Sequence, residues 1–91
     1  MHGEYKTPGG KLVVVDFEVV DGRLTQVMMS GDFFLYPEEA LEPMVGALDG
    51  LAVDVAEGGI ARAVAAAIPE GAELFGFSPE AIEIALRRGL A

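Results

Sequence analysis

A ten-residue run of alternating side chains, over residues 11–20, constrains the fold of this chain more than any other feature. Its odd-numbered members after the first are apolar: Val13, Val15, Phe17 and Val19. The even-numbered positions include Asp16 and Glu18, whose carboxylates favour water. Because side chains two residues apart share a face of a strand, this pattern predicts a half-buried β-strand with the odd-numbered face in the core.

A two-residue turn signal, Asp21-Gly22, follows this run and predicts a β-hairpin. Both residue types tolerate the positive φ angles that the favoured hairpin turns require. An uninterrupted hairpin register places Val15 opposite Met28. It also places the polar Gln26 opposite Phe17 on the face that should be buried, so the far end of the second strand conflicts with the pattern.

The residues after Gly31 predict a short third strand over 32–36 and then a helix. Pro37 and the two acids behind it suit the first turn of a helix, because proline needs no N–H there and carboxylates favour its positive end. Apolar residues continue at helical spacing: Leu41, Met44, Val45 and Leu48. Pro43 lies within this stripe and is expected to kink or split the helix.

Two further helices complete the expected order of elements. One covers part of 53–68, with Gly58-Gly59 weakening its first half. The other begins cleanly, with Ser78 as its N-cap and Pro79 at its first position. Strands followed by helices predict one α+β domain over residues 1–91, in which a small antiparallel three-stranded sheet packs against helices.

The composition excludes several classes of protein. The chain has no cysteine, which rules out disulfides, thiolate metal sites and sulfur chemistry. Its net charge of −9 disfavours nucleic acid as a partner. No run of about 18 apolar residues exists to span a membrane, and residues 1–10 lack the apolar core of a signal peptide. We therefore expect a cytoplasmic protein that binds no metal, nucleic acid or membrane by itself.

The two lysines of this acidic chain lie close together. Lys6 and Lys11 bracket a turn-forming segment that contains Pro8, Gly9 and Gly10. Proline and glycine make ordinary turns before strands, so the segment could be structural only. Alternatively, the glycines allow close approach of the backbone to a ligand, and the two ammonium groups provide a site for an anion.

Three segments resemble the C-terminal accessory domain of lipoate–protein ligases. They are Tyr5-Lys6-Thr7-Pro8-Gly9-Gly10-Lys11-Leu12-Val13, then Ser30-Gly31-Asp32-Phe33-Phe34 with Pro37-Glu38-Glu39-Ala40-Leu41, and, more weakly, Ser78-Pro79-Glu80-Ala81-Ile82. Together they span nearly the whole chain. The resemblance implies a small antiparallel sheet with helices, related in shape to iron–sulfur scaffold and sulfur-acceptor proteins.

The resemblance also implies a function. Ligases of this family first combine lipoate with ATP to give lipoyl-adenylate, and then transfer the lipoyl group to a lysine of an acceptor domain. A large domain holds the adenylation pocket, over which the small domain closes for the first step. The chain would then be the accessory subunit of a heterodimer with a large catalytic subunit. That complex uses ATP, Mg²⁺ and lipoate, whereas the chain alone binds no cofactor and serves lipoyl-acceptor domains indirectly.

The same resemblance assigns contacts with the adenylate or the partner to two segments. The residues are Lys6, Pro8, Gly9, Gly10, Lys11, Asp32, Phe33 and Phe34. Asp32 either ends a turn or has a role in the site, where it orients the lysine loop or contacts the partner. Phe33 and Phe34 are core residues, or one of them faces the partner, since strand neighbours point opposite ways. His2 is expected in a disordered terminus, and no catalytic residue is expected, because the sequence has no Ser-His-Asp set, metal cluster or Walker-type loop.

Two other functions remain open from the sequence. A non-enzymatic module that binds a lipoyl-acceptor protein would use the same surface without any effect on adenylation. A sulfur-acceptor or iron–sulfur scaffold protein of related fold needs a reactive cysteine, which this chain lacks.

Overall fold

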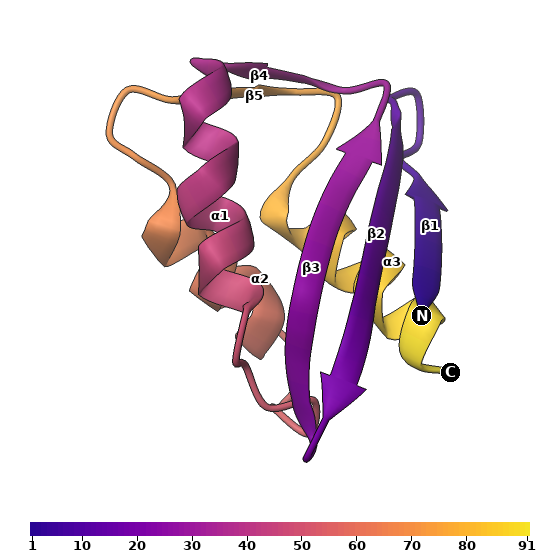
Figure 1. Ribbon diagram of the computed structural model, residues 1–91. Coiled ribbons are helices and arrows are strands. Elements are labelled where there is room, and N and C mark those ends of the chain that lie inside the picture. Colours follow the sequence, from indigo (N-terminus) through magenta and orange to yellow (C-terminus); the bar gives the residue numbers. More distant parts are fainter.

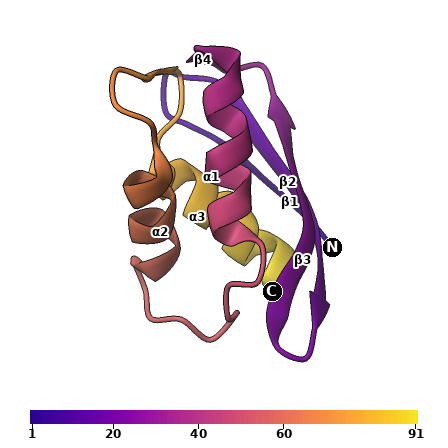
Figure 2. The ribbon, with the colours of Figure 1, turned by 60° about the vertical axis from the view of Figure 1, so that its left-hand side comes forward.

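The computed structural model describes residues 1–91 as a three-stranded antiparallel sheet, a separate two-stranded ribbon and a set of helices (Figure 1). The elements are β1 (His2–Lys6), β2 (Leu12–Val20), β3 (Arg23–Gly31), β4 (Phe34–Tyr36), the 3₁₀-helix η1 (Glu38–Ala40), α1 (Leu41–Leu48), α2 (Gly59–Ala67), β5 (Glu73–Phe75) and α3 (Pro79–Leu90). The larger sheet has the order β1-β2-β3. All three α-helices cover the same face of it (Figure 2). The expected α+β class is confirmed.

The central strand β2 forms as its alternating pattern predicts. Val13, Val15 and Phe17 are buried, and Val19 packs against the core at its edge. The hairpin turn also forms, with φ angles of 53° at Asp21 and 74° at Gly22.

The register next to this turn is as predicted, with Val20 opposite Arg23 and Val19 opposite Leu24, but farther along the hairpin it differs by one residue. Met29, not Met28, lies opposite Val15, because a β-bulge interrupts the ladder between Asp16 and Glu18. Gln26 is the extra residue, with a φ angle of 52° that turns its side chain to solvent. The bulge removes the conflict noted in the sequence: it moves a polar side chain out of the core and returns the next apolar residues to it.

The third strand of the main sheet is β1, not the segment 32–36 as predicted. β1 pairs antiparallel with β2 along its whole length. His2 is therefore ordered, and its two ring nitrogens lie 2.6 Å from Asp16 Oδ1 and 2.6 Å from Glu4 Oε2. A Cβ atom at Gly3 would overlap a carbonyl oxygen of α3, so the absence of a side chain lets this strand lie directly against the helix.

The predicted segment 32–36 contributes a strand elsewhere. Only its last three residues are extended, and as β4 they pair with β5 in the two-stranded ribbon. This ribbon lies at one end of the molecule, above α1 in Figure 1. It is separate from the main sheet.

The helices differ from the prediction mainly in where they begin. α1 starts at Leu41, so Pro43 lies in its first turn, where a missing N–H costs no hydrogen bond, and the preceding residues form η1. α2 starts only at Gly59, with Gly58 as its N-cap at a φ angle of 85°. The two glycines therefore lie at the start of this helix. The expectation that they would weaken it internally is wrong. None of the helices is long and apolar enough to cross a lipid bilayer.

The core fills the space between the covered face of the sheet and the helices. Its largest fully buried side chains are Leu24, Met44, Leu48, Ile60, Ile82 and Leu86. α3 begins as predicted, with the Ser78 hydroxyl accepting the Ala81 N–H at 3.2 Å.

We predict that Gly22→Val lowers stability while Gly46→Ala raises it. A β-branched residue is strained at positive φ, and the strain costs about 1–2 kcal/mol, or roughly 4–8 °C in Tm per kcal/mol. Gly46 lies exposed within α1, where an added Cβ meets nothing within 4 Å, so alanine should contribute about 0.5–1 kcal/mol. Thermal melts by circular dichroism test both substitutions. A Gly22→Val protein as stable as the wild type would show that the turn adopts another geometry.

Candidate functional site

The loop between β1 and β2, residues 7–11, carries the two lysines on a compact turn. The Gly10 N–H donates to the Thr7 carbonyl at 2.9 Å, and the Thr7 N–H donates to the Lys11 carbonyl at 3.2 Å. Pro8 and Gly9 form the exposed tip. Gly9 has a φ angle of 66°, and its N–H donates to no group of the protein. The tip therefore presents a free backbone donor between two cationic side chains.

A carbonyl from the other end of the chain holds this loop. The Gly76 carbonyl oxygen, directly after β5, accepts the Lys11 N–H at 3.1 Å and the Thr7 hydroxyl at 3.0 Å. A Cβ at Gly10 would overlap that same Thr7 hydroxyl. Thr7 lies within the segment that drew attention in the sequence, but nothing local indicated Gly76. The loop is thus fixed to the β4–β5 ribbon as well as to the main sheet.

Asp32 holds the loop from a third direction. Its Oδ1 accepts the Leu12 N–H at 2.6 Å, and its own N–H donates to the Leu12 carbonyl at 3.3 Å. The carboxylate thus lies against the backbone of the residue directly after Lys11. Of the roles considered for Asp32, this geometry suits orientation of the lysine loop.

The two phenylalanines of the second segment point in different directions. Phe33 is partly buried and lies against Phe77, with the ring centroids 4.1 Å apart. Phe34 is the first residue of β4 and points to solvent. The segment therefore divides as neighbouring extended residues should, with one ring in the core and one available to a partner.

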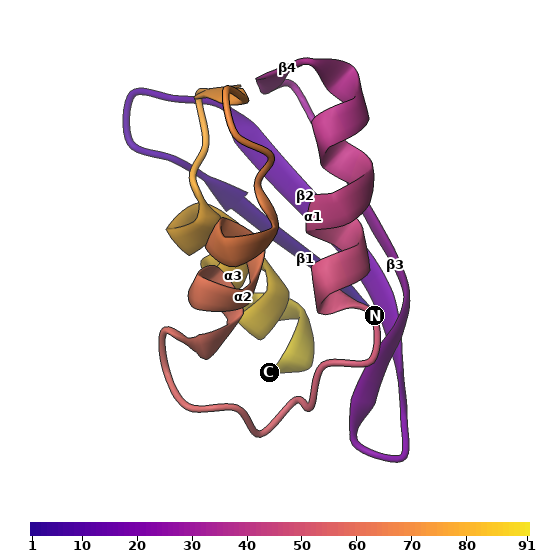
Figure 3. The same ribbon diagram turned by 90° about the vertical axis from the view of Figure 1, so that its left-hand side faces the viewer.

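The charges of the loop are free. Both lysines are exposed, and neither ammonium group lies within 4.0 Å of a carboxylate. All the other residues assigned to the site occur at the same end of the molecule, where the β1–β2 loop and the ribbon meet (Figure 3). No cluster of histidine or acidic side chains could hold a metal ion. The exposed ammonium groups and the free backbone N–H make this arrangement suited to binding an anion.

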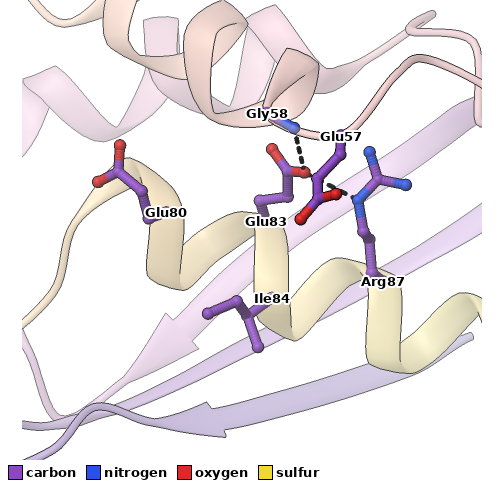
Figure 4. Close-up of a pocket in the computed structure, with 6 residues that line it drawn as sticks. All are labelled: Glu57, Gly58, Glu80, Glu83, Ile84 and Arg87. Atoms are coloured by element: carbon purple, nitrogen blue, oxygen red, sulfur yellow. Dashed lines mark hydrogen bonds and ion pairs between the residues drawn. The ribbon is translucent and has the colours of Figure 1, made fainter.

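A hollow of about 460 Å³ lies away from the lysine loop, at the start of α2 (Figure 4). Glu83 of α3 dominates it, with a side chain only 8% exposed. Its carboxylate accepts the Gly58 N–H at 2.9 Å, the Ala61 N–H at 2.7 Å and Arg87 Nε at 2.8 Å. The N–H groups of Gly58 and Ala61 lie at the start of α2, where the helix itself provides no acceptor for them. Glu83 therefore caps one helix from another.

The ionisation of Glu83 follows from these contacts. Burial raises the pKa of its carboxyl, but hydrogen bonds from Arg87, Ala61 and Gly58 and the charge of Arg87 outweigh burial and hold the pKa below its ordinary value. The group is therefore an anion, and both of its oxygens accept hydrogen bonds. Such a carboxylate stabilises the fold and is a poor candidate for catalysis.

Comparison with known proteins supports the resemblance seen in the sequence. No family model and no curated protein matches the chain. A solved structure matches with a TM-score of 0.70 and 27% identity, over 96% of this chain and 98% of the other. It comes from a structural analysis of an archaeal lipoylation system, a bipartite lipoate protein ligase and its E2 lipoyl domain from Thermoplasma acidophilum. The resemblance to the accessory domain of lipoate–protein ligases is thereby confirmed.

We predict that Asp32→Ala loosens the lysine loop without unfolding the protein. The substitution removes the acceptor of the Leu12 N–H, and an exposed hydrogen bond of this kind contributes about 1 kcal/mol. Hydrogen exchange at the Leu12 amide should accelerate roughly 5-fold. Amides in the middle of α3 provide the internal control. Unchanged protection at Leu12 would mean that Asp32 does not hold the loop in solution.

We further predict that Glu83→Gln destabilises the protein by about 1–3 kcal/mol, because a buried ionic acceptor is replaced by a neutral amide. The effect should depend on pH. Since the folded-state pKa lies below the ordinary 4.5, the contribution of wild-type Glu83 is complete above about pH 4.5 and is lost as the pH falls through the folded-state value. Denaturant unfolding at several pH values should show the two proteins converging in acid. A constant difference across that range would contradict the assignment.

Proposed function

We propose that this chain is the accessory subunit of a lipoate–protein ligase and assists the ATP-dependent formation of lipoyl-adenylate by a large catalytic subunit in the cytoplasm. The observation that carries this proposal is the braced cationic loop, which has two unpaired lysines and a free backbone N–H. It lies in a chain that matches, over 96% of its length, a protein from the structural analysis of a bipartite ligase system.

The chemistry of adenylation explains what such a loop would do. The carboxylate oxygen of lipoate attacks the α-phosphorus of ATP, a phosphorus–oxygen bond to the leaving group breaks, and pyrophosphate departs with increased negative charge. Fixed cationic and N–H donors near that leaving group lower the barrier, because they need no rearrangement as the charge develops. Lys6 and Lys11 would supply the ammonium groups and Gly9 the backbone donor.

ATP, Mg²⁺ and lipoate would bind chiefly to the large subunit. This chain has no side-chain cluster suited to a metal ion, so its residues do not fit a resident Mg²⁺. Its contribution would be positioned charge added from outside the main pocket. The second step, amide formation with release of AMP, requires the pocket to admit a protein lysine, so a closed accessory subunit would obstruct it.

The related system also contains a lipoyl domain, and an acceptor of lipoate is the competing assignment. An acceptor lysine must extend freely into an active site. The stem of Lys11 instead lies against Gly76, where a Cβ would meet its Cγ, and its N–H is bonded to the same residue. A fixed stem suits a stationary charge better than a mobile carrier.

We predict that Lys6→Ala and Lys11→Ala each slow pyrophosphate release by about 10- to 1,000-fold, as expected for loss of one electrostatic donor. Transfer from pre-made lipoyl-adenylate to an acceptor domain should proceed with the large subunit alone. The two half-reactions are assayed separately, with and without this chain. Arg62→Ala, which removes an exposed cation from α2, is the matched control and should have no effect.

Three outcomes separate the possibilities. Efficient adenylation by the large subunit alone would refute the accessory role. Loss of transfer without this chain would assign it to the second step, as a module that binds the acceptor protein. A mass increase corresponding to a lipoyl group on Lys6 or Lys11, after incubation with a complete ligase, would identify the chain as an acceptor.

A further inference from the structure

An exposed aromatic surface lies on the β4–β5 ribbon, next to the lysine loop. Its three rings, Phe34, Tyr36 and Phe75, are 67%, 69% and 49% exposed. Phe34 and Phe75 are direct partners across the ribbon, so their side chains share one face. Leu35 and Leu74, from the alternate positions, pack against the core. One face of the ribbon therefore stabilises the fold, while the other keeps large apolar area in water.

The charges around these rings differ between the two ends of the ribbon. At the end farther from the lysine loop, Glu73 is paired with Tyr36, and Glu38 follows closely in the chain. A hollow of about 660 Å³ lies over this part, lined by Phe34, Leu35, Tyr36, Glu38, Glu73 and Phe75. At the near end, Phe75 is followed by Gly76, whose carbonyl holds the loop of Lys6 and Lys11. The surface thus passes from acidic, through aromatic, to basic.

This pattern is typical of a protein interface. Interfaces combine an apolar centre enriched in aromatic residues with a polar rim, and clustered exposed apolar side chains mark such sites. The order of the charges also constrains the partner, because complementary charge sets the orientation in which two surfaces meet. A partner that fits must be basic where it meets the glutamates, apolar in the middle and loaded with an anion where it meets the lysines.

We propose that the large ligase subunit docks on this aromatic ribbon, with a basic patch facing Glu38 and Glu73 and its bound nucleotide facing Lys6 and Lys11. This inference rests on the proposed function and adds to it the surface and the orientation. The Gly76 carbonyl links the docking surface to the lysine loop, because it accepts hydrogen bonds from that loop. Contact of the aromatic rings with the large subunit would therefore also place the loop of Lys6 and Lys11 over the pocket.

The first test is the double variant Phe34→Ser/Phe75→Ser. Both rings are exposed, so the melting temperature should stay close to that of the wild type. Affinity for the large subunit, measured by calorimetry, should fall at least about 30-fold, the loss associated with one buried interface anchor. Val20→Ser is the matched control. It replaces a 55% exposed apolar residue at the opposite end of the sheet (Figure 1) and should bind like the wild type.

The second test addresses orientation. Glu73→Lys should weaken binding about 3- to 10-fold at low ionic strength, and the difference should shrink in concentrated salt, as for a charge at the interface rim. Glu57→Lys changes the net charge equally. Glu57 is exposed in the segment before α2, which lies at the end of the molecule opposite the ribbon (Figure 3), so this reversal should change binding much less. Equal effects of the two reversals would show that only the overall charge matters and would overturn the proposed orientation.

These results separate this inference from the proposed function. If the wild-type chain binds and stimulates the large subunit while the serine double variant binds equally well, the docking surface is wrong and the accessory role stands. If the wild-type chain neither binds nor stimulates it, the proposed function fails and the inference with it. A homodimer of this chain that the serine double variant abolishes, alongside unchanged binding to the large subunit, would assign the ribbon to self-association and overturn the proposal.

Discussion

Burial of only one face of the three-stranded sheet is the constraint on which the rest of the molecule depends. β2 lies in the centre of the sheet and directs its alternate apolar residues to one side, so all the helices must gather there (Figure 2). They supply the matching apolar side chains, among them Met44, Ile60 and Ile82. The lysine loop and the ribbon meet at one end of this sheet.

The parts of the fold that the sequence predicts correctly are those decided within a few residues. β2 follows from its alternation, the hairpin from Asp21-Gly22 and the start of α3 from Ser78. The register beyond Phe17 could not be predicted, because it depends on a competition between an unbroken ladder and burial of the correct face. Burial prevails, and the ladder accommodates it with a bulge at Gln26. β1 was missed for a similar reason, since a non-local contact at Gly3 holds it and no alternation marks it.

The candidate site also combines residues that the sequence predicts with residues that only the fold reveals. The lysines and Asp32 stand in motifs that can be recognised in the sequence. The structure brings the Asp32 carboxylate within hydrogen-bonding distance of the Leu12 N–H, directly after Lys11. Gly76 and Phe75 lie more than sixty residues from the loop in the chain, so only the packing of β5 beside it reveals them as neighbours. The motif thus marks the two lysines, whereas the fold supplies the hydrogen bonds that hold the backbone of their loop.

The carboxylate of Glu83 has a consequence for how this chain can change during evolution. It satisfies donors of two segments at once, the first turn of α2 and Arg87 of α3. Loss of the acid alone leaves the N–H groups of a helix terminus without an acceptor, and loss of Arg87 alone leaves a buried anion less well neutralised. Replacement of either residue while the other is still present is therefore destabilising. Positions 83 and 87 should therefore covary among homologues, with either the acid and base retained as a pair or both replaced together with a new capping residue at position 58.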